Sequence, residues 1–338
     1  MSARDALAPV LRLAPAKLNL TLAVLGTRPD GFHDLHSVMV PLALSDRLSL
    51  ARAAGPVDSL HVTGDPAIAG EPPIDPAVYD SVLRGIGEAR RAVGRGADAF
   101  SLAARLEKHI PVAAGLAGGS SDAAAAIDGA LEAWGADLAA PDRTTIAAAT
   151  GSDVPFFLAG GSALVEGRGE RVRPLNPFAG QPPAVLLVTP GCRISTRDAF
   201  ATLDADPAAA PANRGSTRLS SEHLATELAS GHPAMDASAL VLRAGVLASA
   251  NDLANAADVL APGLRTLRRA LMRLLGVPIG LSGSGPTLWA LYPSLHNAQV
   301  AAARVRDELR LGTLDSPGDG TPFVEATTIA STQGGSTG

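Results

Sequence analysis

The stretch Pro111-Val-Ala-Ala-Gly-Leu-Ala-Gly-Gly-Ser-Ser-Asp-Ala-Ala-Ala125 decides how the rest of the chain is interpreted. It joins a loop containing Gly115, Gly118 and Gly119 to an alanine-rich run that predicts a helix over 121–134. Glycines allow positive φ and let a ligand approach the backbone closely. A helix that starts after such a loop presents unpaired N–H groups and the positive end of its dipole. The stretch therefore favours a phosphate site over a loop whose glycines only permit tight packing.

The glycine spacing differs from the two common phosphate-binding patterns. A P-loop ends in Gly-Lys-Ser/Thr, whereas Gly119 is followed by Ser120. A dinucleotide fingerprint needs Gly-x-Gly-x-x-Gly directly after a strand. The surrounding order still suits phosphate, because residues 99–106 alternate as a strand does and the predicted helix follows the loop.

Length and composition limit the architecture and the partners. A chain of 338 residues predicts two domains, and we place their boundary in the proline-rich stretch 174–183, giving residues 1–178 and 179–330. A net charge of −5 gives no electrostatic support for binding nucleic acid. The single cysteine excludes an internal disulfide and fits a reducing cytoplasm. With no signal-peptide core and no apolar run of membrane-spanning length, we expect a cytoplasmic protein; residues 331–338 predict a disordered tail.

Residues 10–25 alternate between apolar and polar types, which predicts a strand. The alternation places Lys17, Asn19 and Thr21 on one face. If that face is covered, a lysine and an asparagine there need polar partners. A solvated edge strand explains the same pattern equally well.

Phe32 and His33 follow the turn sequence 29–31. They offer a ring that can stack and an imidazole that can donate or accept hydrogen bonds. Such a pair is more often one core residue and one surface residue, so the pattern alone does not favour a site.

Asp153 lies between a predicted helix ending at Gly151 and an apolar segment, and Pro155 prevents that helix from continuing. A helix cap and a functional carboxylate are equally good interpretations of it. A second glycine stretch, 280–292, leads into an apolar strand instead of a helix. It is therefore a weak phosphate signal, and a simple tight turn explains it as well.

The loop sequence Pro-x-x-x-Gly-Leu-x-Gly-Gly-Ser-Ser-x-Ala-Ala resembles the ATP loop of the GHMP kinase superfamily, which includes galactokinase, homoserine kinase and mevalonate kinase. Within it, the chain resembles the kinases of 4-diphosphocytidyl-2-C-methyl-D-erythritol, over residues 10–310. The other segments that carry this resemblance are Ala14-Pro-Ala-Lys-Leu-Asn-Leu20, Asp30-Gly-Phe-His-Asp-Leu35, Gly151-Ser-Asp-Val-Pro-Phe-Phe157, Asn251-Asp-Leu253 and Leu281-Ser-Gly-Ser-Gly-Pro-Thr287.

The resemblance implies an α+β fold of two domains. The N-terminal domain would be like ribosomal protein S5 domain 2, and the C-terminal domain would be a ferredoxin-like α/β sandwich. It also implies ATP-dependent phosphorylation of the substrate's 2-hydroxyl, in the methylerythritol phosphate route to isoprenoids. We expect a monomer or homodimer. A homoserine or mevalonate type of kinase, and a nucleotide-binding regulator without catalysis, are the alternatives.

The resemblance further implies roles for residues in the matching segments. Asp153 would take the proton from the 2-hydroxyl, and Lys17 would sit beside it and favour the developing alkoxide. Asn19 and His33 would hydrogen-bond the substrate, His33 at the cytosine edge. Phe32 and Phe200 would stack on the cytosine ring. Phe32 stands where the family usually has tyrosine, so stacking is kept and the phenol's hydrogen bond is lost.

The ATP side of the site is implied in the same way. Mg²⁺ would bridge the phosphates, with Ser121 as a metal ligand, and Lys108 would lie near the adenine. Asp80 and Ser81 replace the family's Asn-Leu at a position near the adenine. The residues that would hold the ATP phosphates are Pro111, Gly115, Leu116, Ala117, Gly118, Gly119, Ser120 and Ser121.

Overall fold

The computed structural model describes residues 8–64, 68, 76–94, 100–206, 215–231 and 234–330. The expected tail 331–338 lies outside these residues. By their contacts the residues form two compact units. The first unit consists of Met1–Ala16, Leu44–Val112 and Ala117–Ala159, and the second of Lys17–Ala43, Ala113–Leu116 and Gly160–Gly338. These units interleave along the chain and so do not test the predicted domain boundary near residue 178.

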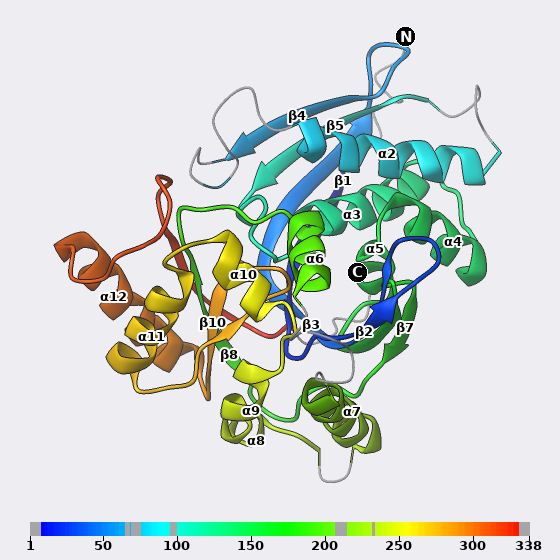
Figure 1. The fold of residues 1–338 in the computed structure, drawn as a ribbon. Helices are drawn as coiled ribbons and strands as arrows, with labels where there is room; N and C mark the ends of the chain where they lie inside the picture. Colours follow the sequence, from blue (N-terminus) through cyan, green and yellow to red (C-terminus); the bar gives the residue numbers. More distant parts are fainter. Residues whose placement is uncertain are drawn as a thin grey trace. The chain divides into compact units, whose positions relative to one another are not determined.

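The first unit is a sheet covered by helices. Strand β5 (Leu102–Lys108) pairs antiparallel with residues 47–52 of β3 (His33–Arg52) and parallel with β4 (Ser59–Gly64). Strand β1 (Val10–Asn19) also pairs with β3. Helices α2 (Pro76–Ala92) and α3 (Gly118–Ala133) lie side by side (Figure 1). The shared core includes Leu48, Leu50, Val82, Ile86, Leu106 and Ile127.

Strand β3 is longer than its sequence predicts. The sequence predicts a strand over 38–50 that is broken at Ser45-Asp46-Arg47, but β3 runs without a break from His33 to Arg52. The break is absent because the Asp46 side chain is fully buried and hydrogen-bonded. Its carboxylate accepts a hydrogen bond from the backbone N–H of Ile110 at 2.9 Å and one from Lys108. A buried, paired carboxylate is compatible with a strand interior, whereas a solvated one favours a turn.

Two helix boundaries also differ from the prediction. Helix α3 begins at Gly118, three residues before Ser121, after Ala117 in the left-handed conformation (φ 54°). Helix α4 (Ala140–Thr150) ends before Gly151 as expected. A further short helix, α5 (Val154–Ala159), then begins with Pro155 in its first turn, where a missing N–H is tolerated.

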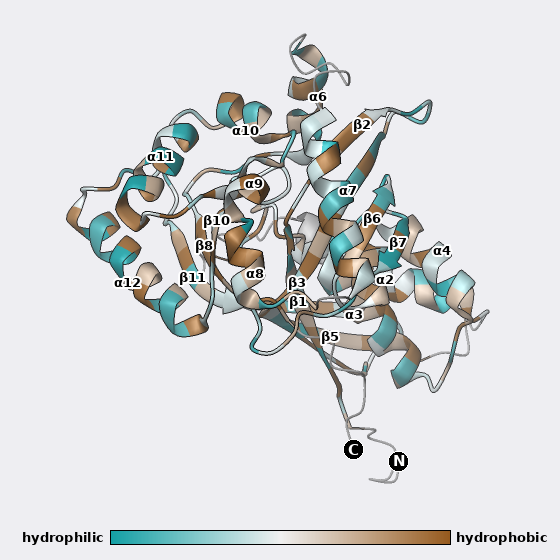
Figure 2. Cartoon of the chain, turned by 90° about the horizontal axis from the view of Figure 1, so that it is seen from below, coloured by the Kyte–Doolittle hydropathy of each residue, from teal (hydrophilic) through white to brown (hydrophobic). Residues whose placement is uncertain are grey.

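The second unit contains the sheet β11-β8-β10-β9, whose strands are all antiparallel to their neighbours. The strands are β8 (Ala184–Thr189), β9 (Gly280–Leu281), β10 (Leu288–Tyr292) and β11 (Phe323–Thr328). Helices α10 (Ala254–Leu260), α11 (Leu264–Leu275) and α12 (Leu295–Leu311) share a core with this sheet. Figure 2 shows hydrophilic and hydrophobic residues alternating along α12, whose buried positions recur at helical spacing.

The second unit also holds the strands that carry the expected substrate residues. Residues 35–39 of β3 pair with β6 (Ala163–Gly167), which pairs with β7 (Arg171–Pro174). Strand β2 (Ala23–Thr27) pairs with the start of β3, Thr27 opposite His33. The other helices described in this unit are α6 (Thr196–Ala205), α7 (Gly215–Ser230), α8 (Ala237–Leu242) and α9 (Ala244–Ser249). No helix in the described ranges has both the length and the apolar character needed to cross a bilayer.

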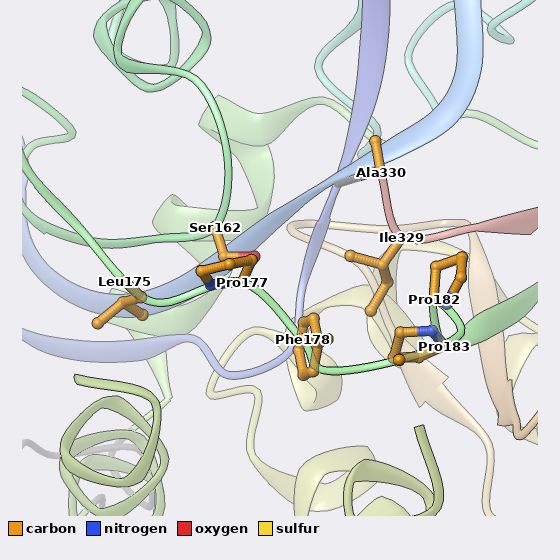
Figure 3. A pocket seen from close by; sticks show the side chains of 9 residues that line it. Ser162, Leu175, Pro177, Phe178, Pro182, Pro183, Ile329 and Ala330 are labelled. Atoms are coloured by element: carbon orange, nitrogen blue, oxygen red, sulfur yellow. The ribbon is translucent and has the colours of Figure 1, made fainter. Parts of the chain in front are cut away.

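The proline-rich stretch 174–183 packs against the end of the chain's described part (Figure 3). The backbone N–H of Ile329 donates to the carbonyl of Pro183 at 2.8 Å. A small hollow opens there, lined by Ser162, Leu175, Pro177, Phe178, Gly180, Pro182, Pro183, Ile329 and Ala330. None of the expected site residues lines this hollow.

Candidate active site

Lys17 is buried, with 4 % of its surface exposed, and its ammonium has defined acceptors. Its Nζ donates to Asn19 Oδ1 at 2.5 Å and to the carbonyl oxygen of Gly115 at 3.1 Å. The Lys17 backbone N–H donates to the carbonyl of Leu116 at 3.0 Å. Strand β1 therefore holds a lysine ammonium against the backbone of the predicted ATP loop.

Asn19 is occupied at both ends of its amide. Its Oδ1 accepts from Lys17, and its Nδ2 donates to Ser37 Oγ at 2.8 Å. The network continues, because Ser37 Oγ donates to the carbonyl of Thr21 and Thr21 Oγ1 lies 2.7 Å from Ser221 Oγ. The face that carries Lys17, Asn19 and Thr21 is therefore covered and satisfied, which excludes a solvated edge strand.

His36 closes this network on the other side of Ser221. Its Nδ1 lies 2.8 Å from Ser221 Oγ, and the Ser221 hydroxyl also donates to the His36 carbonyl. Burial lowers the pKa of His36, because the charged imidazolium loses hydration there. A neutral His36 therefore fits the network.

The second glycine stretch belongs to this region, which its sequence alone did not establish. A Cβ at Gly283 (φ +55°) would lie 3.1 Å from both Lys17 Nζ and the carbonyl oxygen of Gly115. Ser282 Oγ donates to the same carbonyl at 3.0 Å. Asn251 Nδ2 donates to the carbonyls of Leu281 and Gly283, each at 2.9 Å. In the sequence, the contact of this glycine stretch with Gly115 and Lys17 was indicated only by the presence of 251–253 and 281–287 among the segments that resemble the kinase family.

The glycines of the ATP loop serve different geometric purposes. Gly115 has φ +76°, and a Cβ there would lie 2.3 Å from the carbonyl oxygen of Ser282, so no side chain fits. Gly118 lies in the first turn of α3, and the non-glycine residues Ala113 and Ala117 adopt left-handed conformations beside it. No side chain caps the helix. Its first N–H groups lack intrahelical acceptors and remain directed at the loop.

Lys108 lies beneath this helix start in a buried ion cluster. A Cβ at Gly118 would lie 3.3 Å from Lys108 Nζ. The ammonium donates to Asp122 Oδ2 at 2.8 Å and to Asp46, and all three side chains are at most 2 % exposed. Burial, together with the neighbouring Asp46 carboxylate, raises the pKa of Asp122 to about 7. Burial lowers the pKa of Lys108, but the two carboxylates outweigh it and the pKa of Lys108 is raised.

This cluster predicts a pH-dependent stability difference for Asp122→Asn. A carboxyl whose folded-state pKa is raised stabilises the fold below its unfolded pKa, near 3.8, and loses that contribution as pH rises through about 7. Asparagine keeps an acceptor for Lys108 and does not titrate. Between about pH 5 and about pH 8, the melting temperature of the wild type should therefore fall relative to that of the variant. Asp58→Asn, which removes a carboxylate from the pair with Arg90, is the control; equal pH dependence of Asp122→Asn and the wild type would contradict the assignment.

Asp153 occupies the turn between α4 and α5 and is partly exposed. In the described part of the chain, no residue donates a hydrogen bond to the Asp153 carboxylate or forms an ion pair with it. The carboxylate therefore does not cap the start of α5. A Cβ at Gly151 would lie 3.9 Å from Ser120 Oγ. Within the first unit, the turn that carries Asp153 therefore lies beside the first turn of α3.

Two of the three expected cytosine residues, His33 and Phe200, lie in contact in the second unit. The rings of His33 and Phe200 stack with centroids 4.5 Å apart and an interplanar angle of 19°. His33 Nε2 lies 2.9 Å and 3.1 Å from the two carboxylate oxygens of Asp204. Phe32 is 45 % exposed, and the guanidinium of Arg168 lies 5.1 Å from its ring centroid. Asp204 escaped the sequence interpretation because no recognised motif includes it.

Ser121 fits a limited role toward Mg²⁺. The residue is 1 % exposed, and its hydroxyl has no hydrogen-bond partner among the described residues. No group of three or more His, Cys, Asp or Glu side chains in the described ranges could hold a metal. Mg²⁺ accepts water and phosphate oxygens readily, so one hydroxyl with ATP phosphates is a chemically suitable donor set.

Known families match both parts of the chain. The sequence model of the GHMP kinases N terminal domain matches residues 81–161, and that of the GHMP kinases C terminal domain matches residues 237–311. The structure aligns with that of homoserine kinase from Cytophaga hutchinsonii with a TM-score of 0.64 and 18 % sequence identity. The alignment covers 97 % of this chain and 96 % of that one. This likeness shows the fold alone. The chain is a two-domain α+β GHMP kinase.

Curated relatives narrow the class. The 4-diphosphocytidyl-2-C-methyl-D-erythritol kinase of Pelotomaculum thermopropionicum is 35 % identical over 88 % of this chain and 94 % of its own length. That of Nocardia farcinica is 39 % identical over 88 % and 89 %. A crystal structure of 4-(cytidine 5'-diphospho)-2C-methyl-D-erythritol kinase aligns with a TM-score of 0.63 at 29 % identity, over 94 % of this chain and 99 % of that one. The chain belongs to the 4-diphosphocytidyl-2-C-methyl-D-erythritol kinase family.

Proposed function

We propose that this chain transfers the γ-phosphoryl group of ATP to the 2-hydroxyl of 4-diphosphocytidyl-2-C-methyl-D-erythritol. Membership of the GHMP kinases implies ATP as the donor. The named substrate of the curated relatives, which match 88 % of this chain, supports the acceptor. The structural observation that carries the catalytic part is the buried Lys17 ammonium at the carbonyl of Gly115.

We assign the proton transfer to Asp153. The 2-hydroxyl would lose its proton to the Asp153 carboxylate while its oxygen forms a bond to the γ-phosphorus and the bond to the β-phosphate oxygen breaks, releasing ADP. The absence of a hydrogen-bond donor to Asp153 among the described residues supports this role, because a carboxylate committed to a cap would be a weaker base. The Lys17 ammonium would stabilise the negative charge that develops on the attacking oxygen.

The glycine loop supplies the ATP phosphate site in this proposal. The uncapped start of α3 offers backbone N–H groups and a helix dipole to the phosphates. Mg²⁺, held by the phosphates and Ser121, would neutralise phosphate charge. Lys108, whose ammonium is bonded to Asp46 and Asp122, would support the start of α3, and its place near the adenine stays a prediction.

The substrate residues follow from the cluster at His33. His33 and Phe200 would bind the cytosine, while Phe32 offers a ring face at the surface. Asn19 would act on the substrate through Lys17, because both ends of its amide are occupied. We infer a cytoplasmic enzyme of small-molecule metabolism, a monomer or homodimer, without nucleic-acid or membrane partners.

A coupled assay of ADP release tests this proposal. The purified protein should turn over Mg·ATP with 4-diphosphocytidyl-2-C-methyl-D-erythritol, and ³¹P NMR should show a new phosphate ester on the 2-oxygen. Homoserine and mevalonate serve as competing acceptors. Turnover with either of these, but not with the cytidyl substrate, would overturn the proposal, and ATP binding without any turnover would indicate a regulator.

A further inference from the structure

Helix α6 presents two side chains to His33 at once. Phe200 and Asp204 are four residues apart and therefore lie on the same face of the helix. Phe200 stacks on the imidazole, and the Asp204 carboxylate contacts its Nε2 with both oxygens. The His33 side chain is 8 % exposed, so its ring has little freedom to turn away from them.

The ring is also fixed from its own backbone and from the apolar surroundings. His33 starts strand β3 and is paired with Thr27 of β2. Phe200 and Leu35 pack against a cluster formed by Leu22, Val24, Leu203, Leu253 and Ala256. The strand and the helix are thus held together by apolar packing close to the imidazole. The contact between His33 and Asp204 is therefore part of a packed site.

A carboxylate next to one nitrogen of a neutral imidazole decides where the ring's proton lies. An ionised carboxylate only accepts hydrogen bonds, so Nε2 must carry the hydrogen. The other nitrogen, Nδ1, then presents a lone pair and can only accept. Nδ1 has no hydrogen-bond partner within the described part of the chain, so it is available to a ligand.

We propose that Asp204 is a positioning residue that fixes His33 with its proton on Nε2, so that Nδ1 selects cytosine over uracil. This inference rests on the proposed function. Cytosine carries an amino group at position 4, which donates, whereas uracil carries a carbonyl there, which accepts. An Nδ1 lone pair forms a hydrogen bond with the first and is repelled by the second. Asp204 therefore determines the nucleobase preference indirectly, because it keeps the imidazole proton on Nε2 and leaves the lone pair on Nδ1.

Asp204→Ala tests this assignment through a ratio of activities. The readout is kcat/KM for the cytidyl substrate divided by kcat/KM for its uridyl analogue. Without Asp204 the ring can place its proton on either nitrogen, and Nδ1–H would donate to the uracil carbonyl. We expect the ratio to fall by about ten- to a hundredfold, the loss of one buried hydrogen-bond preference. Asp198→Ala is the matched control, because it removes an exposed carboxylate from the first turn of the same helix.

A second measurement does not depend on turnover. In ¹⁵N-histidine-labelled protein, the two ring nitrogens of neutral His33 should have the distinct shifts of an Nε2–H tautomer, and Asp204→Ala should move both shifts toward a tautomer average. His33→Ala identifies the resonance.

The outcomes separate this inference from the proposed function. If wild-type protein fails to phosphorylate the cytidyl substrate, the proposed function is wrong, while the NMR result still decides the tautomer. If wild-type protein is active and Asp204→Ala lowers kcat/KM equally for both nucleobases, Asp204 merely supports helix α6 and the inference is overturned. An unchanged ¹⁵N spectrum in the variant overturns it as well.

Discussion

Asp153→Asn is expected to lower kcat by about two to four orders of magnitude, the usual contribution of a general base. Asparagine has nearly the same shape but cannot accept the hydroxyl proton. ADP affinity, measured by calorimetry, should stay within about threefold of the wild type, because the phosphate contacts come from backbone N–H groups of α3. Steady-state kinetics with saturating Mg·ATP give the decisive number.

The control for Asp153 is Asp142→Asn, an exposed carboxylate in the first turn of the preceding helix. This variant should keep wild-type kinetics, since Asp142 lies on the outer surface of α4. If Asp153→Asn retained more than about a tenth of the wild-type rate, the general-base role would be rejected.

Lys17→Met is expected to lower kcat/KM by about two to three orders of magnitude, the range seen when one preorganised electrostatic donor is removed. Methionine approximates the length of the lysine stem and carries no charge. The variant leaves Asn19 Oδ1 without this donor, which costs about 1–3 kcal/mol when such a group stays buried, whereas the Gly115 carbonyl keeps its hydrogen bond from Ser282 Oγ. The variant also avoids the desolvation penalty of burying the Lys17 ammonium, which offsets part of that cost. We therefore expect a folded protein with little activity.

Single-turnover rates and thermal unfolding of the same preparation separate the two effects of Lys17→Met. Arg12→Met provides the control, because Arg12 is a cation on the same strand that pairs with Glu132 at a partly exposed position. Surface pairs of that kind contribute little. If Lys17→Met turned over at a rate similar to that of the wild type, the catalytic role of the ammonium would be rejected, and a lower melting temperature alone would assign it a structural role.

Sequence patterns predicted the elements of the fold where one period dominates. The stretch 99–106 alternates between apolar and polar types and contributes to strand β5, and the alanine-rich run after the glycine loop forms helix α3. Patterns failed where a tertiary contact reverses a local preference. Asp46 reads as a turn residue, yet Lys108, 62 positions away, allows it to stay within a strand.

The candidate site also contains residues that the sequence identifies and residues that only a tertiary contact identifies. Lys17, His33, Phe200 and the glycine loop were accessible through motif resemblance. Asp204 was not, because its significance depends on a contact with a residue 171 positions earlier. Asn19 was found, but its amide holds Lys17 and Ser37, and no spacing rule distinguishes a residue that touches substrate from one that holds its neighbour.

The left-handed alanines of the loop have a consequence for how nucleotide is bound. Ala113 and Ala117 hold φ values of 55° and 54°, a conformation that costs an alanine about 1–2 kcal/mol relative to the ordinary helical region. Such residues persist only when surrounding contacts hold them, and an alanine has fewer alternative states to visit than a glycine. The loop is therefore ordered when the chain folds and not when ATP arrives. Binding of the nucleotide then does not carry the conformational-entropy cost of ordering a flexible loop.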